Sequence, residues 1–261
     1  MRQRTARRQE DRFVLEGAKL LEVALDAEAS LEAVYHAPGA LASRTAADLV
    51  ERAREGGARV FPLRDGVLER VTDTVTPQPL CAVAATRDVP LPTLLAAGEI
   101  ARRPLVVCVD VRDPGNLGAI LRSADAAGTA GVLVCGESTD VYNPKVVRAS
   151  AGAIFRVPLA LAGDAGEALA AVGAAGLRRV GTLARGGEDY TLASLDPPLA
   201  LVLGNEASGL GAPVAALLDG AVTIPMEGGE SLNVAMAATV LCFEAARRRR
   251  AAEAGGRDHL R

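Results

Sequence analysis

The chain has 261 residues, of which 49% are hydrophobic and only 3% aromatic, and its formal net charge is −3. The hydrophobic fraction is ample for a packed core and excludes a chain that is disordered throughout. The negative net charge excludes a protein that wraps nucleic acid over its whole surface, although it leaves local basic patches possible.

The first part of the chain predicts a small α/β domain, which we expect over residues 1–95. Apolar periodicity favours a helix from about Arg12 to Ala27 and a second helix over residues 45–57. Short apolar runs predict strands at 31–37, 58–63 and 80–86. Residues 96–104, which end at Pro104, are expected to form a linker.

Beyond Pro104, apolar runs alternate with helical segments, which predicts an α/β domain over residues 105–261 with a parallel sheet covered by helices on both faces. The expected strands are 105–111, 131–135, 180–184, 199–204 and 221–225. The expected helices are 117–127, 144–151, 165–175, 211–218 and 231–249. Ligands of such sheets gather at the carboxyl ends of the strands, so functional residues are expected there.

The first informative segment is 110–128, where a strand ends, 113-DPG-115 turns the chain, and Asn116 can cap the following helix. Gly118 and Arg122 are four residues apart and share one helical face, so the glycine leaves space one turn from the guanidinium. Spacing alone leaves two interpretations open. One is a ligand pocket, and the other is an ordinary capped helix with a surface arginine.

The second segment, 199–211, is an apolar strand that leads directly into Gly204, Asn205 and Glu206. Glycines allow a backbone to turn sharply or to approach a ligand closely. A carboxylate at this position either binds a ligand or accepts hydrogen bonds at a helix N-terminus. A tight turn between strand and helix explains the pattern equally well.

The third segment is 221–250, in which 224-IPM-226 closes a strand and a long helix follows from Ser231. This helix is apolar almost all round, which predicts that it is buried. A place in the core of the domain and a place in an interface between subunits fit the pattern equally.

Together the three segments resemble the motifs of the SpoU-type branch of the SPOUT RNA methyltransferases. The matching stretches are 116-NLGAILRSA-124, 204-GNEASGL-210 and 224-IPMEGGESLNVAMA-237, in the family's order. Residues 145-KVVRASAGAIFRVP-158 are similar to the stretch that the family carries between its first two motifs. The stretch 12-RFVLEGAKLLEVAL-25 is similar to the small RNA-binding domain, itself like a ribosomal protein, that precedes many members' catalytic domain.

The resemblance implies a parallel sheet whose C-terminal segment forms a trefoil knot, with S-adenosylmethionine as the cofactor. The loops of the knot would hold the cofactor, largely through backbone groups. Carried over by motif, the cofactor-binding residues are Thr182, Leu183, Gly204, Ile224, Met226 and Leu232. Members of the family are homodimers through this C-terminal domain, which favours the interface interpretation of the last helix.

The resemblance also implies that a ribose 2′-hydroxyl of RNA is methylated, with Arg122 at the hydroxyl or the adjacent phosphate and Asn116 supporting it. Glu206, Ser231 and Asn233 would shape the site. An arginine side chain is too weak an acid to act readily as a general base, so we expect it to stabilise charge and bind phosphate. Ala207 departs from the family, in which many members have glycine, and this leaves the local backbone shape open.

The predicted function is therefore ribose 2′-O-methylation of a structured RNA, with ribosomal RNA as the expected substrate. Transfer RNA is the alternative substrate, and a non-catalytic RNA-binding or ribosome-assembly protein on the same fold is the alternative function. The paired motif residues favour the enzyme. A nucleotide-binding protein is disfavoured because no glycine-rich phosphate loop follows the first strand.

Cysteines and basic residues complete the expectations. The four cysteines are far apart and predict free thiols in a reducing compartment, with no metal site. Arginines cluster in the first dozen residues and at 247–250, where solvated surface and RNA contact are both open interpretations. No apolar run is long enough to cross a membrane, so a cytoplasmic protein is expected.

Overall fold

The computed structural model describes residues 4–71, 78–229 and 231–258 and divides the chain into two compact units. The first unit contains residues 1–87 and 140–156, and the second contains residues 88–139 and 157–261. The residues expected as a linker, 96–104, thus lie inside the second unit, where the side chain of Ile100 is 4% exposed and belongs to the hydrophobic core.

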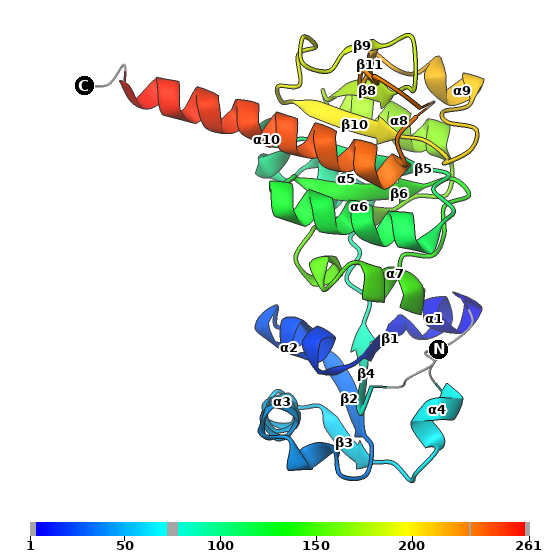
Figure 1. The fold of residues 1–261 in the computed structure, drawn as a ribbon, viewed down its shortest axis with the longest axis vertical. Helices are drawn as coiled ribbons and strands as arrows, with labels where there is room; N and C mark the ends of the chain where they lie inside the picture. The colour runs from blue at the N-terminus through cyan, green and yellow to red at the C-terminus, as the bar shows by residue number, and fades with distance from the viewer. Residues whose placement is uncertain (1–3, 72–77, 230, 259–261) are drawn as a thin grey trace. The chain divides into compact units, whose positions relative to one another are not determined.

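The first unit is built on a four-stranded sheet in the order β1-β4-β2-β3 (Figure 1). Its elements are α1 (Arg4–Glu10), β1 (Arg12–Glu16), α2 (Ala18–Asp26), β2 (Leu31–His36), the 3₁₀ helix η1 (Ala40–Ala42), α3 (Arg44–Glu55), β3 (Arg59–Pro62), α4 (Val67–Val71), β4 (Leu80–Ala85), α7 (Pro144–Ala149) and the 3₁₀ helix η3 (Ala153–Phe155). β4 pairs antiparallel with β1 and β2, whereas β2 and β3 run parallel. β3 is therefore an edge strand.

The helix expected from Arg12 to Ala27 is wrong in its first part, because residues Arg12–Glu16 form the strand β1. Phe13 and Leu15 are 0% and 1% exposed while their neighbours are half-buried, which is the alternation of a strand with one buried face. The chain then turns at Gly17, whose φ of 95° favours glycine, and α2 follows. The apolar residues of β1 and α2 together fit the spacing of one helical face, which is why the sequence predicts a single helix, but Gly17 separates the two elements.

The segment 140–156 belongs to the first unit although it lies between two strands of the second unit's sheet. The Nε of Arg7 donates to Asp140 at 2.8 Å, and the Arg7 side chain is only 5% exposed. The ring of Phe13 lies 4.8 Å from that of Tyr142 and 5.9 Å from that of Phe155. A buried ion pair and an aromatic cluster therefore attach this segment to the N-terminal residues.

The second unit contains a seven-stranded sheet in the order β7-β6-β5-β10-β8-β11-β9, in which every pairing is parallel. Its strands are β5 (Leu105–Val109), β6 (Gly131–Cys135), β7 (Leu159–Leu161), β8 (Arg178–Thr182), β9 (Glu188–Asp189), β10 (Leu199–Leu203) and β11 (Gly220–Thr223). The short edge strands β7 and β9 are not among the expected strands. The predicted parallel sheet is confirmed.

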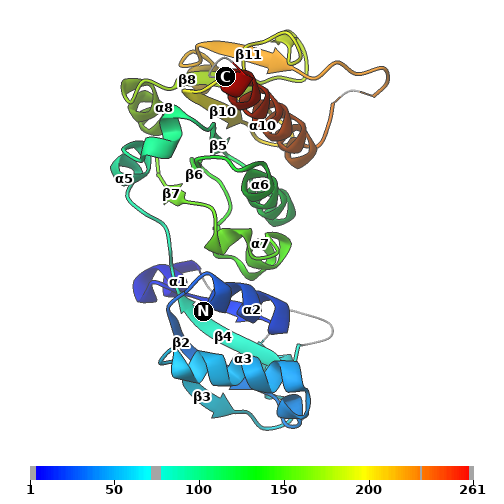
Figure 2. The same cartoon turned by 90° about the vertical axis from the view of Figure 1, so that its left-hand side faces the viewer.

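Helices cover both faces of this sheet (Figure 2). They are α5 (Leu91–Leu95), the 3₁₀ helix η2 (Gly98–Ala101), α6 (Pro114–Ala127), α8 (Ala165–Ala174), α9 (Ala212–Ala215) and α10 (Val234–Asp258). In Figure 2, α5 and α8 lie on one side of the strands, and α6 and α10 lie on the other. β10 is inserted between β5 and β8, so its carboxyl end is next to the carboxyl ends of both.

The last helix, α10, packs against α6, with the hydroxyls of Ser123 and Thr239 2.7 Å apart. Its small residues Ala235, Ala238 and Ala245 are buried. Met236 and Phe243 are 61% and 42% exposed, so one face of this helix is not covered within the single chain, and the helix does not lie wholly in the core of the domain.

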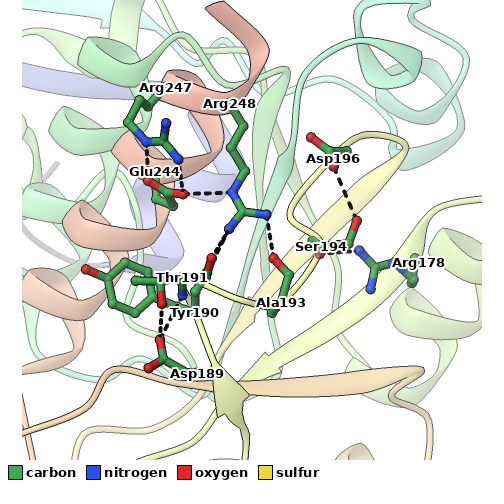
Figure 3. A network of polar contacts seen from close by, with 10 residues as sticks. All are labelled: Arg178, Asp189, Tyr190, Thr191, Ala193, Ser194, Asp196, Glu244, Arg247 and Arg248. Atoms are coloured by element: carbon green, nitrogen blue, oxygen red, sulfur yellow. Dashed lines mark hydrogen bonds and ion pairs between the residues drawn. The ribbon is translucent and has the colours of Figure 1, made fainter. Parts of the chain in front are cut away.

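Arginines just past the middle of α10 contact other residues of the second unit (Figure 3). Arg248 donates to the carbonyl oxygens of Tyr190, Thr191 and Ala193 and to the carboxylate of Glu244. Arg249 donates to the carbonyl oxygens of Ala127 and Gly128 at the end of α6. The hydrogen bonds from Arg247 and Arg248 lower the pKa of Glu244 to about 2, although burial of the carboxylate raises it in part. The run of arginines in the sequence does not by itself predict these hydrogen bonds.

The four cysteines are buried free thiols, as the sequence predicts. Burial raises the pKa of Cys81, Cys135 and Cys242 to about 12, so these thiols are protonated and inert. Among the described residues, no group of three or more His, Cys, Asp and Glu side chains is arranged to hold a metal ion. Within the same residues, none of the helices has both the length and the apolar character that crossing a membrane requires.

Candidate functional site

Three loops of the second unit form a pocket at the carboxyl ends of β8, β10 and β11. Thr182 ends β8, Gly204 follows β10, and Ile224 follows β11. The pocket is lined by Thr182, Leu183, Ala184, Gly204, Asn205, Glu206, Ala207, Gly209, Val222, Ile224, Met226, Ser231, Leu232, Val234, Ala237 and Leu241. All six residues expected to bind the cofactor are in this set. The pocket combines apolar walls with backbone groups, as small-molecule sites commonly do.

Gly204 stands where the backbone doubles back on itself. A Cβ at this position would lie 2.5 Å from the carbonyl carbon of Gly209 and 2.7 Å from the backbone nitrogen of Leu210. Asn205 and Gly209 exchange two backbone hydrogen bonds, of 3.0 and 2.9 Å, which close this turn. The glycine is thus required by contact with backbone, which cannot move aside as a flexible side chain can.

The side chain of Asn205 organises the same turn. Its Oδ1 accepts hydrogen bonds from the backbone N–H groups of Ala207 and Ser208, both at 3.0 Å, and its Nδ2 donates to the carbonyl oxygen of Asp110 at 2.9 Å. Ala207 is not among the residues with positive φ, so the alanine fits the turn without strain. This answers the question raised by the absence of glycine at position 207.

Asn116 does not cap α6, which corrects the sequence interpretation. Asp113 is the N-cap, and its Oδ1 accepts a hydrogen bond from the backbone N–H of Asn116 at 2.8 Å. Pro114 occupies the first turn, where its missing N–H costs nothing. The side chain of Asn116 is thereby available for contacts outside the helix.

The amide of Asn116 joins the three motif segments. Its Oδ1 accepts from the Nδ2 of Asn233 at 2.9 Å, and its own Nδ2 donates to the Oε1 of Glu206 at 3.1 Å. Asn233 in turn caps α10, because its Oδ1 accepts from the backbone N–H of Ala235 at 2.8 Å. One hydrogen-bond chain therefore holds the starts of α6 and α10 against the loop that follows β10.

The ionised carboxylate of Glu206 is the last member of this hydrogen-bond chain. Its Oε1 also accepts from the backbone N–H of Asp113 at 3.0 Å, and its Oε2 accepts from that of Arg112 at 3.2 Å. Partial burial is the largest single influence and raises the pKa of Glu206, but the hydrogen bonds from Asn116 and from backbone N–H groups together outweigh it and lower the pKa. A carboxylate held in this way is a weak base and a strong anchor.

The remaining two predicted residues lie apart from the chain of hydrogen bonds. Ser231 lines the pocket, just before α10. Arg122 is exposed on α6, does not line the pocket, and makes no hydrogen bond or ion pair with any residue that the structure describes. The structure thus brings Asn116, Glu206 and Asn233 together and leaves the guanidinium of Arg122 available to a bound molecule.

Sequence reasoning missed three residues of the site, namely Asp113, Asn205 and Asp110. Asp113 has a signal, since an aspartate followed by proline is typical of a helix start. Asp110 has φ 56°, an uncommon conformation for a residue other than glycine, and its Oδ1 accepts from the backbone N–H of Glu137 at 2.6 Å. No local pattern predicts that conformation, because it is set by contacts distant in sequence.

Family models match both parts of the chain. Residues 103–243 match the SpoU rRNA Methylase family, and residues 1–82 match the MRM3-like substrate binding domain. The first match contains all three motif segments, and the second lies in the first unit. The recognised families therefore follow the order of the two expected domains.

Individual relatives agree with this assignment. The chain is 31% identical over 232 residues to the 23S rRNA (guanosine(2553)-2′-O)-methyltransferase RlmP of Bacillus subtilis, covering 88% of this chain and 87% of the relative. The SpoU methyltransferase AviRb from Streptomyces viridochromogenes, solved with the cofactor AdoMet, is similar with a TM-score of 0.84 and 30% identity, covering 95% of this chain and 94% of that one. The AdoMet-bound rRNA methyltransferase from Sinorhizobium meliloti gives a TM-score of 0.83 and 30% identity, covering 94% and 91%.

Proposed function

The chain belongs to the SpoU rRNA methylase family, and on that basis we propose that it transfers a methyl group from S-adenosylmethionine to a ribose 2′-hydroxyl of ribosomal RNA. The observation that carries this proposal is the hydrogen-bond chain from Asn233 through Asn116 to Glu206, beside a pocket built from backbone turns. A protein that only binds RNA has no need of a pocket organised in this way.

The pocket fits S-adenosylmethionine, which supplies an electrophilic methyl group when bound. Leu183, Ile224, Met226 and Leu232 offer apolar contact, and Gly204 exposes backbone polar groups that a side chain would cover. Two relatives of similar sequence and fold have been solved with AdoMet bound. We therefore assign these residues, with Thr182, to binding the cofactor.

The chain's own residues must orient the hydroxyl and ease the loss of its proton. The guanidinium of Arg122 is a cation with several N–H donors, so its role is to stabilise negative charge on the ribose oxygen and to bind the adjacent phosphate. Glu206 is not the base, because four donors engage its carboxylate and its pKa is lowered. The proton then leaves to phosphate or water. Asn116, Glu206, Ser231 and Asn233 position the loops around the reacting groups.

Incubation of the protein with tritiated S-adenosylmethionine and purified RNA tests the function. We expect label at one nucleotide of 23S ribosomal RNA. The phosphodiester bond that follows this nucleotide should become resistant to alkaline hydrolysis, because a 2′-O-methyl group cannot attack it. Label confined to transfer RNA would favour the alternative substrate. Absence of transfer to total RNA from cells that lack the gene would contradict the proposal.

We further propose a homodimer through the second unit, supported by Met236 and Phe243, which are exposed seven residues apart on α10. Exposed large apolar side chains on one helical face favour an interface. The position of β10 between β5 and β8 is consistent with the trefoil knot of the family resemblance, which we also propose. Ribosomal RNA as substrate would place the enzyme in the cytoplasm.

Replacing both Met236 and Phe243 by glutamate is expected to convert the dimer to monomers, because charge at the centre of an apolar interface is costly to desolvate. Multi-angle light scattering gives the mass of each variant. Leu41→Glu is the matched control, since Leu41 is 40% exposed in the first unit. A wild-type protein that is monomeric at micromolar concentration would contradict the interface.

A further inference from the structure

Two of the chain's seven Phe and Tyr residues stack on each other at the surface of the first unit. The rings of Tyr35 and Phe61 have centroids 5.5 Å apart and planes inclined by 22°. Tyr35 is half-buried, whereas Phe61 is 38% exposed. By contrast, Phe13, Tyr142 and Phe155 are buried together in the same unit. A protein with so few aromatic residues thus leaves a stacked pair open to solvent.

The pair lies at the edge of the sheet. Tyr35 and Phe61 are direct partners in the parallel pairing of β2 with β3, and among the described residues β3 is the outermost strand of this sheet. Arg59 stands two residues before Phe61, so both side chains point to the same face. Its guanidinium carbon lies 5.8 Å from the centre of the Phe61 ring. The edge of the sheet therefore presents the stacked rings of Phe61 and Tyr35 together with the guanidinium of Arg59.

Two arginines and one carboxylate form a cluster that adjoins the pair. Glu32 accepts from Arg59 at 2.6 Å and from Arg12 at 3.1 Å, so a single carboxylate is shared by two guanidinium groups. The side chain of Arg59 is 64% exposed and that of Arg12 is 34% exposed. Exposed ion pairs are weak, so these arginines can exchange the carboxylate for a phosphate.

We propose that Tyr35, Phe61 and Arg59 form a stacking site for an unpaired base of the substrate RNA, with Arg59 and Arg12 contacting the neighbouring phosphates. Exposed aromatic rings beside arginines are how single-stranded RNA is bound, because every base offers a flat face and every linkage a negative charge. This site rests on the proposed RNA substrate, and it specifies which residues of the first unit bind that RNA. Packing of β2 against β3 explains the aromatic pair but does not explain why two arginines lie near it.

Binding of a nine-nucleotide RNA strand with 2-aminopurine at its centre tests the site in the full-length protein. Stacking quenches the fluorescence of 2-aminopurine, so we expect quenching by the wild-type protein. Phe61→Leu keeps apolar contact with Tyr35 but removes the ring, and it is expected to raise the Kd about tenfold and to abolish quenching. Arg59→Gln should reduce the slope of log Kd against log salt by about 0.7, the contribution of one phosphate contact.

Leu41→Ala is the matched control, because Leu41 has a similar exposure, 40%, in the same unit, and this variant should bind like the wild type. Thermal unfolding shows that each variant is folded, and Arg59→Gln carries the test if Phe61→Leu is not. Unchanged Kd and quenching in Phe61→Leu, or equal losses in Leu41→Ala, would overturn the stacking site. Methyl transfer measured in parallel separates the two proposals: active wild-type protein without quenching refutes only this site, and quenching without transfer to any RNA refutes only the enzyme.

Discussion

Replacing Arg122 by alanine is expected to lower the rate of methyl transfer by about 10²- to 10³-fold, the usual cost of removing one donor that stabilises developing charge. The guanidinium is exposed on α6 and has no polar partner among the described residues, so its loss leaves no buried group unpaired. The free energy of unfolding should therefore change by no more than about 0.5 kcal/mol. Single-turnover transfer of a tritiated methyl group measures the rate, and thermal unfolding measures the stability.

Three comparisons make the Arg122 result specific. The Kd for S-adenosylmethionine, measured by calorimetry, should be unchanged, because Arg122 does not line the pocket. Arg122→Lys keeps the charge but not the planar fork and should recover only part of the rate. Arg102→Ala removes another exposed arginine of the second unit and should be fully active. A fully active Arg122→Ala enzyme would remove this residue from the mechanism.

Replacing Gly204 by alanine is expected to abolish detectable cofactor binding and to destabilise the second unit by about 1–3 kcal/mol, as overpacking typically does. The added methyl group would meet the backbone of Gly209 and Leu210 at 2.5–2.7 Å, so the whole 204–210 turn must shift. That turn carries Glu206 and one wall of the pocket. Calorimetric titration with S-adenosylmethionine and urea unfolding measure the two effects.

Gly211→Ala is the matched control for Gly204→Ala. A Cβ at Gly211 would meet only the Cδ of Pro213, at 3.8 Å, and the φ of −62° suits alanine. This variant should bind the cofactor normally and be as stable as the wild type or slightly more so. If Gly204→Ala and Gly211→Ala bind the cofactor equally well, close backbone approach is not what shapes the pocket.

The parallel sheet of the second unit is predictable from sequence because its central strands are buried on both sides and form continuous apolar runs. β5, β6 and β10 are buried throughout. The strands' carboxyl ends then indicate where the motif residues gather. The same logic fails for β7 and β9, since edge strands of three and two residues are too short to carry a pattern.

Contacts between residues distant in sequence set the limits of prediction. The pairing of Arg7 with Asp140 joins residues 133 positions apart, and no local signal anticipates it. The role of Asn116 also depends on such contacts, because a helix cap explains an isolated asparagine equally well. Only the structure shows that Asp113 takes the cap, and that the Asn116 amide is thereby available to Glu206 and Asn233.

The first unit is built from two separate stretches of sequence, which limits how it can be replaced by that of a relative. A chimera that takes only residues 1–87 from a relative would set foreign side chains against Asp140, Tyr142 and Phe155, which pack here on Arg7 and Phe13. Segment 140–156 would have to be exchanged together with residues 1–87. In this chain, two separate stretches of sequence must therefore be exchanged together if the fold of the first unit is to be kept.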